Sequence, residues 1–306
     1  MTGFFEELDQ RFQEGNLEKI EGWMTETLTR LEGEGRGESG EYASVLNELA
    51  CFYRGVSRYS ESADTFDRSL RMMERLGLER SSQYATILVN LAGLYRLTGE
   101  HEKAAEVFLR AKELLERSGR EPAYAYVSVL NNLALVYQET GRLEEALSQV
   151  QEALAYFVTQ SGKEHEIATT HANLAAIYLG MGDLEQAERE TLAALEMFEA
   201  MPKQDDHHAA SLATLAAIRS RQGETDEAAA LLERALELTE RFFGKNINYA
   251  VAEHSLALVY EKQGKLEKAL ACLEQAIADL SAILGPEHTR VREWKRLLAD
   301  MEGAEA

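Results

Sequence analysis

Hydrophobic residues recur along the chain in pairs of helical stripes separated by short breaks. In one such stretch, apolar residues three and four positions apart form a stripe from Val129 to Tyr137, and a second stripe runs from Leu143 to Phe157. This spacing places each set on one face of a helix. Gly141 lies in the break between them, and glycine suits the left-handed conformation that ends a helix. The stretch therefore predicts two helices joined by a tight turn.

The same helical hairpin returns every 41 to 42 residues over most of the chain. Its turn position is held in succession by Gly15, Ser57, Gly99, Gly141, Gly182, Gly223 and Gly264. A fixed period of this size predicts a solenoid, because each hairpin can bury its apolar face only against its neighbours. Signals for strands are scarce. We therefore expect an all-α fold, an α-solenoid of about seven helical hairpins.

Small residues recur where the two helices of a hairpin must approach each other. The first helix of each repeat carries Ala50, Ala92, Ala134, Ala175, Ala216 and Ala257, and the second carries two further series, Ala104, Ala146, Ala187, Ala228, Ala269 and Ala111, Ala153, Ala194, Ala235, Ala276. A methyl side chain lets two helix backbones come close while larger neighbours fill the space around it. Each alanine series therefore predicts a packed helix–helix contact.

The ends of the chain depart from the regular repeat, as capping units do. We expect one solenoid domain over residues 1–306, with a degenerate amino-terminal repeat over 1–36, six regular repeats over 37–286, and a capping helix and tail over 287–306. In the last segment, Arg290 to Met301 predicts the capping helix. Seven hairpins and one cap make fifteen helices.

The repeat resembles the tetratricopeptide repeat (TPR). The matching residues of one unit are Leu133, Ala134, Tyr137, Gly141, Ala146 and Ala153. The usual period of that family is about 34 residues, so both helices are longer here. The loops that begin at Gly162 and Gly285 are similar to those of kinesin light chains and their bacterial relatives. The resemblance implies a right-handed TPR superhelix that binds proteins or peptides, but it does not imply a particular partner.

The formal net charge of -21 changes the picture of what binds. It argues against nucleic acid and against anionic membranes, because both attract cationic surfaces. Two explanations of this charge remain open. Acidic solvent-facing sides can keep the array soluble, or an acidic surface can match a basic partner. Cys51 and Cys272 lie at opposite ends of the array, so we expect both to be free. The sequence shows neither a signal peptide nor a membrane-spanning stretch, and we expect a cytoplasmic protein.

The first helix of each repeat lines the concave surface in such arrays, and its polar positions are candidate ligand contacts. One equivalent position holds Asn90, Asn132 and Asn173, and the position four residues earlier holds Thr86, Ser128 and Thr169. Residues four apart share a helix face, and a carboxamide both donates and accepts hydrogen bonds. This pattern suits gripping the backbone of an extended peptide. The alternative is that the asparagines satisfy neighbouring helix ends or water. Groove asparagines that bind peptides are also what the TPR resemblance implies.

Arg54 and Arg96 follow one turn further along the same helices. They predict either a cationic end of the groove that grips carboxylates, or arginines that are solvated or paired with an acid such as Glu48. Chaperone-binding TPR proteins add basic residues to their groove asparagines. Here Thr86 and Ser128 stand where those basic residues would lie, which disfavours that activity.

Tyrosines recur at the start of the first helix of a repeat, and they have two interpretations. They are Tyr42, Tyr84, Tyr126 and Tyr249. They either pack between repeats, which we favour, or form an aromatic rim for a ligand.

A metal site at Asp205, Asp206, His207 and His208 is disfavoured, because adjacent histidines point in different directions.

The sequence therefore predicts a non-enzymatic scaffold that grips an extended peptide or a partner helix in its concave groove. We expect no cofactor and no metal. The alternative is a peptide-responsive regulator similar to bacterial Rap-type proteins, in which binding changes the curvature of the solenoid. An enzyme built on the array would need a catalytic constellation, and none is visible in the sequence. Self-association through the edges or caps is compatible with each of these hypotheses.

Overall fold

The structure is a computed structural model that describes residues 2–14, 17–121, 123–201 and 206–303. These residues form fifteen α-helices and no strands, which confirms the predicted all-α solenoid of hairpins with a final single helix. The turn residues Gly15 and Asn16 lie outside the described residues. The final helix, α15 (Thr289–Gly303), matches the predicted cap and extends it by one residue at its start and two at its end.

The helices divide into two compact units, residues 1–149 and 150–306, and each is described by itself. The first unit contains α1 (Thr2–Glu14), α2 (Leu17–Gly33), α3 (Gly40–Gly55), α4 (Tyr59–Arg75), α5 (Ser82–Leu97), α6 (His101–Arg117) and α7 (Ala123–Glu139). The division falls within α8 (Leu143–Phe157). The second unit continues with α9 (Glu164–Met181), α10 (Leu184–Ala200), α11 (Asp206–Gln222), α12 (Thr225–Phe243), α13 (Ile247–Lys262), α14 (Leu266–Leu284) and α15.

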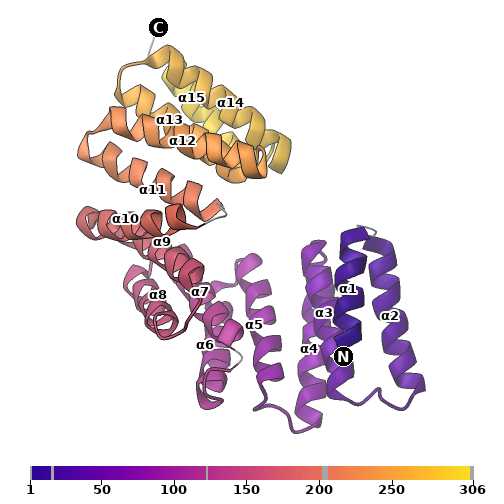
Figure 1. Ribbon diagram of the computed structural model, residues 1–306. Helices are drawn as coiled ribbons and strands as arrows, with labels where there is room; N and C mark the ends of the chain where they lie inside the picture. The colour runs from indigo at the N-terminus through magenta and orange to yellow at the C-terminus, as the bar shows by residue number, and fades with distance from the viewer. Residues whose placement is uncertain (1, 15–16, 122, 202–205, 304–306) are drawn as a thin grey trace. The chain divides into compact units, whose positions relative to one another are not determined.

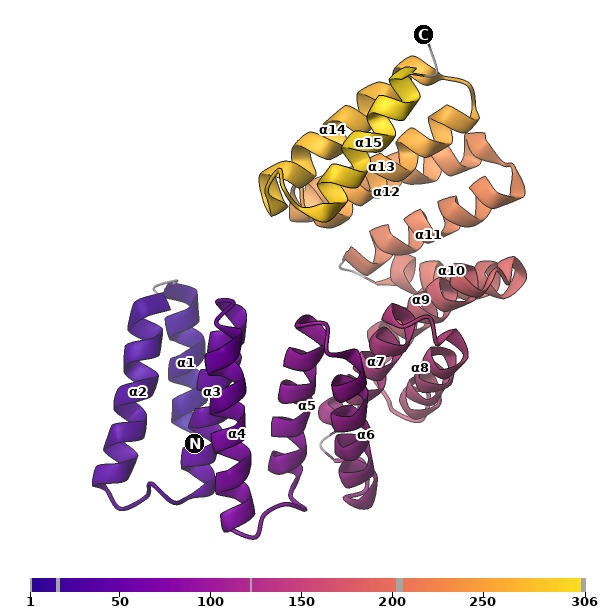
Figure 2. The same ribbon diagram turned by 180° about the vertical axis from the view of Figure 1, so that it is seen from behind.

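Consecutive helices pair as antiparallel hairpins in both units (Figure 1). In the first unit, α3 packs on α4 and α5 on α6, and each first helix of a repeat also contacts the next one, α3 with α5 and α5 with α7. In the second unit, the pairs are α9 with α10, α11 with α12 and α13 with α14. The last helix, α15, packs against α14, as the reverse view also shows (Figure 2). Two expectations stay predictions, namely one continuous solenoid over residues 1–306 and a right-handed superhelix.

The three alanine series are buried as the sequence predicts. Every one of the sixteen alanines is at most 2% exposed. The first regular repeat substitutes serine in both second-helix series, at Ser62 and Ser69, and both side chains are fully buried. Their hydroxyls donate to helix α3, Ser62 to the Ala50 carbonyl at 2.8 Å and Ser69 to the Ala43 carbonyl at 2.7 Å. The small serine therefore keeps the close contact and satisfies its own polar atom.

The tyrosines at the start of the first helices are buried, so the packing interpretation is right and the aromatic-rim interpretation is wrong. Tyr84 is fully buried. Its hydroxyl donates to Glu74 at 2.8 Å and accepts from Arg110 at 2.9 Å, which joins helix α5 to α4 and α6. Burial, followed by the hydrogen bond to Glu74, raises the pKa of Tyr84 to about 12. The other three tyrosines are at most 8% exposed.

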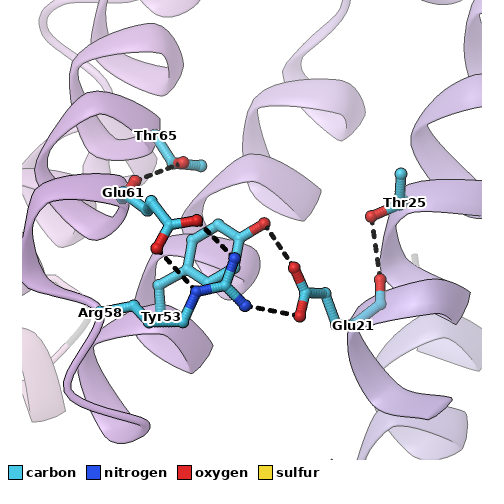
Figure 3. A network of polar contacts seen from close by, with 6 residues as sticks. All are labelled: Glu21, Thr25, Tyr53, Arg58, Glu61 and Thr65. Atoms are coloured by element: carbon cyan, nitrogen blue, oxygen red, sulfur yellow. Dashed lines mark hydrogen bonds and ion pairs between the residues drawn. The ribbon is translucent and has the colours of Figure 1, made fainter. Parts of the chain in front are cut away.

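A polar network ties the amino-terminal hairpin to the first regular repeat (Figure 3). Arg58, in the turn between α3 and α4, reaches Glu21 of α2 at 2.6 Å and pairs through both of its remaining nitrogens with Glu61 of α4. Its guanidinium lies 4.3 Å from the centre of the Tyr53 ring, and the Tyr53 hydroxyl donates to Glu21 at 3.1 Å. Bidentate pairing and stacking use the planar form of the guanidinium. The amino-terminal hairpin is therefore held by charge as well as by packing.

The turn at Ser57 uses a conformation that glycine supplies in the other repeats. Ser57 has φ +62°, and Gly99 and Gly141 at the equivalent position have φ +80° and +73°. This left-handed region costs a residue with a β-carbon about 1 kcal/mol or more. We expect Ser57→Gly to raise the free energy of unfolding by about 0.5–1 kcal/mol, net of the flexibility that glycine adds to the unfolded chain. Urea unfolding measures it, with Ser60→Gly at the start of α4 as the control that must destabilise.

Candidate functional site

A hollow of about 300 Å³ lies among the first helices of the hairpins in the first unit. It is lined by Phe5 of α1, by Ser44, Asn47 and Glu48 of α3, by Ser82, Gln83, Thr86 and Ile87 of α5, and by Tyr124 of α7. We call it the α3–α5 hollow. Thr86 is one of the predicted contacts, and Ser44 and Glu48 occupy the equivalent hydroxyl and carboxamide positions of the preceding repeat. The helix face selected from the repeat pattern therefore borders a real depression.

Two asparagine side chains hold the carboxylate of this hollow in place. The Asn90 amide donates to the Asn47 carboxamide oxygen at 3.1 Å, and the Asn47 amide donates to Glu48 Oε1 at 3.0 Å. Asn47 is only 5% exposed. Asn90 thus acts on the hollow through Asn47, from the neighbouring helix. The sequence pattern did not reveal Asn47, because it lies one residue away from the repeated polar position.

A glutamine links the two helices at the other end of the hollow. Gln83 Nε2 donates to the Gly40 carbonyl at 2.7 Å and to the Ser44 hydroxyl. The Thr86 hydroxyl donates to the Ser82 carbonyl of its own helix at 3.0 Å, so its lone pairs remain as acceptors for a ligand. Helices α3 and α5 therefore present fixed oxygen acceptors to the space between them.

Two exposed aromatic rings border the same hollow. Tyr124 is 70% exposed and Phe5 is 40% exposed. Tyr124 lies two residues before the buried Tyr126, and two residues on a helix differ by about 200° in direction. Sequence reasoning missed Tyr124 because the repeated tyrosine is the buried one. The sequence feature that could have identified Tyr124 is that this tyrosine lies outside the periodic series.

The two predicted groove arginines contact neighbouring helices. Arg54 donates to the Asn90 carbonyl at 2.9 Å, and its Nη1 lies 3.0 Å from the position that a β-carbon would take on Gly93. Arg96 pairs with Glu139 of α7 at 2.7 Å. Both contacts join one first helix to the next. Arg96 is paired with an acid, as the paired-arginine interpretation has it, whereas Arg54 meets a backbone carbonyl. A role for either arginine in binding stays a prediction.

The remaining predicted contacts lie on α7 and α9. The Asn132 amide donates to the Ser128 carbonyl at 2.8 Å and to its hydroxyl at 3.3 Å, within α7. On α9, the Thr169 hydroxyl is buried and has no hydrogen-bond partner among the described residues. Asn173 is partly exposed on the same helix. These four residues stay predicted contacts.

The second unit has a depression of about 270 Å³ between α11 and α13, which we call the α11–α13 trough. Its lining is mainly small or apolar, and includes Ala213, Ala217, Ser255, Leu258 and Val259. At its edge, Lys262 donates to the Ser220 hydroxyl at 2.9 Å. Arg221, which also lines the trough, donates to the Leu179 carbonyl at 2.7 Å. Both cations join the ends of successive first helices.

Three of the histidines pack or pair within the fold. His254 stacks on Trp294 of α15 with ring centres 4.4 Å apart, and burial lowers its pKa. His171 pairs with Glu190 at 2.6 Å. His208 is buried against Phe198, whereas the Asp205 position and the Asp206 side chain lie outside what the structure describes. Within the described part of the chain, no group of three metal-ligating side chains gathers.

The two cysteines are free of disulfide bonds, as predicted. Burial, followed by the charge of Glu48, raises the pKa of the Cys51 thiol to about 12. Burial also raises the pKa of Cys272. A thiol with a raised pKa is a weak nucleophile at neutral pH, so both side chains act as packing groups.

Among the described helices, none is long and apolar enough to cross a membrane.

One buried carboxylate stands out in the second unit. Glu253 of α13 is 7% exposed, and its Oε2 has no hydrogen-bond partner in the described structure. Burial, followed by the charge of Asp279 on α14, raises its pKa to about 7. Lys245 pairs with Asp279 at 2.8 Å rather than with Glu253.

Comparison with known protein families shows which family this helical repeat belongs to. Residues 71–302 match the MalT-like TPR region, and the chain belongs to that family. This confirms the resemblance to tetratricopeptide repeats, whose arrays are generally non-catalytic scaffolds. No curated protein sequence matches the chain.

Solved structures share the fold at low sequence identity. BtubC (BKLC) from P. vanneervenii has a TM-score of 0.61 and 23% identity, over 74% of this chain and 92% of that one. A putative kinesin light chain with nearly identical TPR-like repeats from Podosopora anserina has a TM-score of 0.52 and 21% identity, over 64% and 94%. NprR in complex with its cognate peptide NprX has a TM-score of 0.55 and 18% identity, over 98% and 87%. The apo form of the quorum sensor NprR from B. thuringiensis has a TM-score of 0.59 and 16% identity, over 96% and 85%.

Proposed function

We propose that this protein is a non-enzymatic scaffold that binds an extended peptide along the first helices of its repeats. The observation that carries the proposal is the α3–α5 hollow, where polar side chains from successive repeats border one depression. Hydroxyl and carboxylate oxygens there can accept hydrogen bonds from a peptide backbone or side chain. Membership of the TPR family supports it, as does the fold that the chain shares with the peptide-bound NprR.

The candidate contacts fall in both units. In the first unit they are Thr86, Asn90, Ser128, Asn132, Arg54 and Arg96, and in the second they are Thr169 and Asn173. The α11–α13 trough adds an apolar surface suited to a hydrophobic side chain of the same ligand or of a second one. Each unit can be tested separately.

Bulky substitutions in the two depressions are expected to block peptide binding. The probes are the peptides selected from a random twelve-residue phage library panned on the full chain. Thr86→Trp fills the α3–α5 hollow and Ala217→Trp fills the α11–α13 trough. At least one of the two should weaken the selected peptides about tenfold or more by calorimetry, because the occupied space is no longer available.

The matched controls place the same tryptophan on the second helices. Leu109→Trp in α6 and Leu192→Trp in α10 replace residues that are each 47% exposed. They should leave the affinity within about twofold, and circular dichroism should show a native helix content for all four variants. Selected peptides that bind all four as tightly as the native chain would refute the first helices of the repeats as the binding face.

A further inference from the structure

A second hollow of the first unit, of about 420 Å³, is lined by three arginines of one helix. Its polar lining consists of Arg68, Arg71 and Arg75 of α4, Tyr42 of α3, Glu32 of α2, and Glu38. We call it the arginine hollow. We propose that it binds the phosphate group of a phosphate monoester, with Arg71 and Arg75 as the direct contacts. This site is separate from the proposed peptide site and takes a different class of ligand.

The arginine hollow lies on the other side of α3 from the α3–α5 hollow. Tyr42 and Leu46 line the arginine hollow, whereas Ser44 and Glu48 line the α3–α5 hollow. Two residues on a helix that are two positions apart differ by about 200° in direction. A ligand in the arginine hollow therefore does not compete for the side chains of the peptide site, and the two sites can be tested independently.

The next repeat shows what is unusual about this set of arginines. The three arginines of α4 are three and four residues apart, so they share one face of the helix. At the equivalent position of the next repeat, 42 residues after Arg71, α6 has Glu113. Glu113 pairs with Arg117 at 2.5 Å, and Arg117 is the equivalent of Arg75. In the arginine hollow a cation stands in place of that acid.

The two proposed contacts have weak partners or no acidic partner. Arg75 Nη2 lies 3.6 Å from the Met72 sulfur, and no acid pairs with Arg75 in the part of the chain that the structure describes. Arg71 Nη2 lies 3.7 Å from Asp67 Oδ2, with side chains 69% and 53% exposed, and so loose a surface pair contributes little. The chain has 53 acidic and 32 basic residues, so acids are plentiful. Two neighbouring arginines without a close acid therefore indicate a place for an external anion.

The other charged groups of the hollow favour a compact anion. Glu32 accepts a hydrogen bond from the Tyr42 hydroxyl at 2.7 Å, and Arg68 interacts with the same tyrosine, so this part of the lining is engaged within the fold. Glu32 and Glu38 both repel an extended run of negative charge, such as nucleic acid or an acidic peptide. A phosphate monoester concentrates its charge on three oxygens, which two guanidinium forks can share.

The test compares fluorescent peptides of the sequence Gly-Ala-Gly-Xaa-Gly-Ala-Gly, in which Xaa is phosphoserine, serine or glutamate. Fluorescence anisotropy with the full chain, at physiological salt to screen its overall negative charge, should give the phosphoserine peptide a Kd below about 1 mM. The serine and glutamate peptides should bind at least about tenfold more weakly, because they lack the dianion. Equal binding of the phosphoserine and glutamate peptides, or a phosphoserine Kd above about 1 mM, would overturn the proposal.

An unlabelled competitor identifies what carries the phosphate. If ribose 5-phosphate displaces the phosphoserine peptide with a similar Kd, the hollow takes small phosphate esters, which its volume accommodates. If ribose 5-phosphate binds at least about tenfold more weakly than the peptide, the hollow takes a phosphorylated side chain of a partner protein. Both results support a phosphate site. Displacement by unphosphorylated ribose at the same concentration would contradict it.

Matched variants locate the contact. Arg75→Gln should weaken the phosphoserine peptide about tenfold, since a charge-assisted contact is lost. Arg71→Glu should weaken it by about thirtyfold or more, because the introduced carboxylate repels the phosphate and pairs with Arg75 as Glu113 pairs with Arg117. All three arginines to be changed are exposed, so the variants keep the fold, and circular dichroism checks this.

The control for the arginine variants is Arg117→Gln in α6. It removes the same charge as Arg75→Gln, at the equivalent exposed position of the next repeat, and should change the affinity less than about twofold. Equal effects of Arg75→Gln and Arg117→Gln would mean that only the overall charge of the chain governs binding, and the inference would fall.

Discussion

Phe108→Ala is expected to lower the free energy of unfolding by about 3–5 kcal/mol, the usual cost of truncating a fully buried phenylalanine. Phe108 of α6 is 0% exposed. It occupies the second-helix position that holds Phe66 one repeat earlier, where the side chain is also completely buried. Truncation leaves a cavity that alanine-rich surroundings fill poorly, since small neighbours have no side chain to move into it.

The neighbouring residue is the natural control for this measurement. Leu109 is 47% exposed, so Leu109→Ala should cost under about 1 kcal/mol. Urea unfolding followed by far-ultraviolet circular dichroism measures both variants. Because repeat arrays can unfold in parts, the midpoint and the steepness of each curve should be compared. Similar curves for the two variants would mean that the α5–α6 contact is not the core of this repeat.

Glu253→Gln is expected to stabilise the protein by about 3 kcal/mol at pH 8 and to have little effect at pH 5. The folded state raises the pKa of Glu253 from its usual 4.5 to about 7, through burial and the charge of Asp279. Between these values the folded state holds a proton that the unfolded state releases. Rising pH therefore favours unfolding across this window. Each pKa unit corresponds to about 1.4 kcal/mol, so a rise from 4.5 to about 7 gives about 3 kcal/mol.

Chemical unfolding at several pH values measures this effect. Glutamine keeps the shape of Glu253 without the ionisation, so the variant should lose the decline of stability between about pH 5 and pH 8. Glu237→Gln on the exposed face of α12 removes the same charge and is the control. The groups that face Glu253 are Asp279, Lys245 and Glu240. Parallel pH profiles for the native chain and the Glu253 variant would contradict a buried, protonated carboxyl.

The candidate site shows which residues a repeat pattern can identify and which it cannot. The pattern grouped polar residues on one side of the first helices, because residues four apart must share one side of a helix. One of these residues, Thr86, borders the α3–α5 hollow, and its role in binding stays a prediction. The pattern did not reveal that Asn90 acts through Asn47, nor that Tyr124 borders the hollow. Those facts depend on residues that break the period, which a search for equivalent positions passes over.

The sequence by itself determined the family of this protein, its fifteen helices and the burial of its alanines, because these follow from the apolar period and from the local chemistry of the turns. Only the tertiary structure decided which polar residues are engaged. Arg54 meets the Asn90 carbonyl, 36 residues further along the chain, and Arg96 meets Glu139, 43 residues away. Such partners come from different helices, and their pairing depends on side-chain reach across a packed interface. The hydrophobic period of the sequence does not indicate which polar side chains of two different helices come within reach of each other.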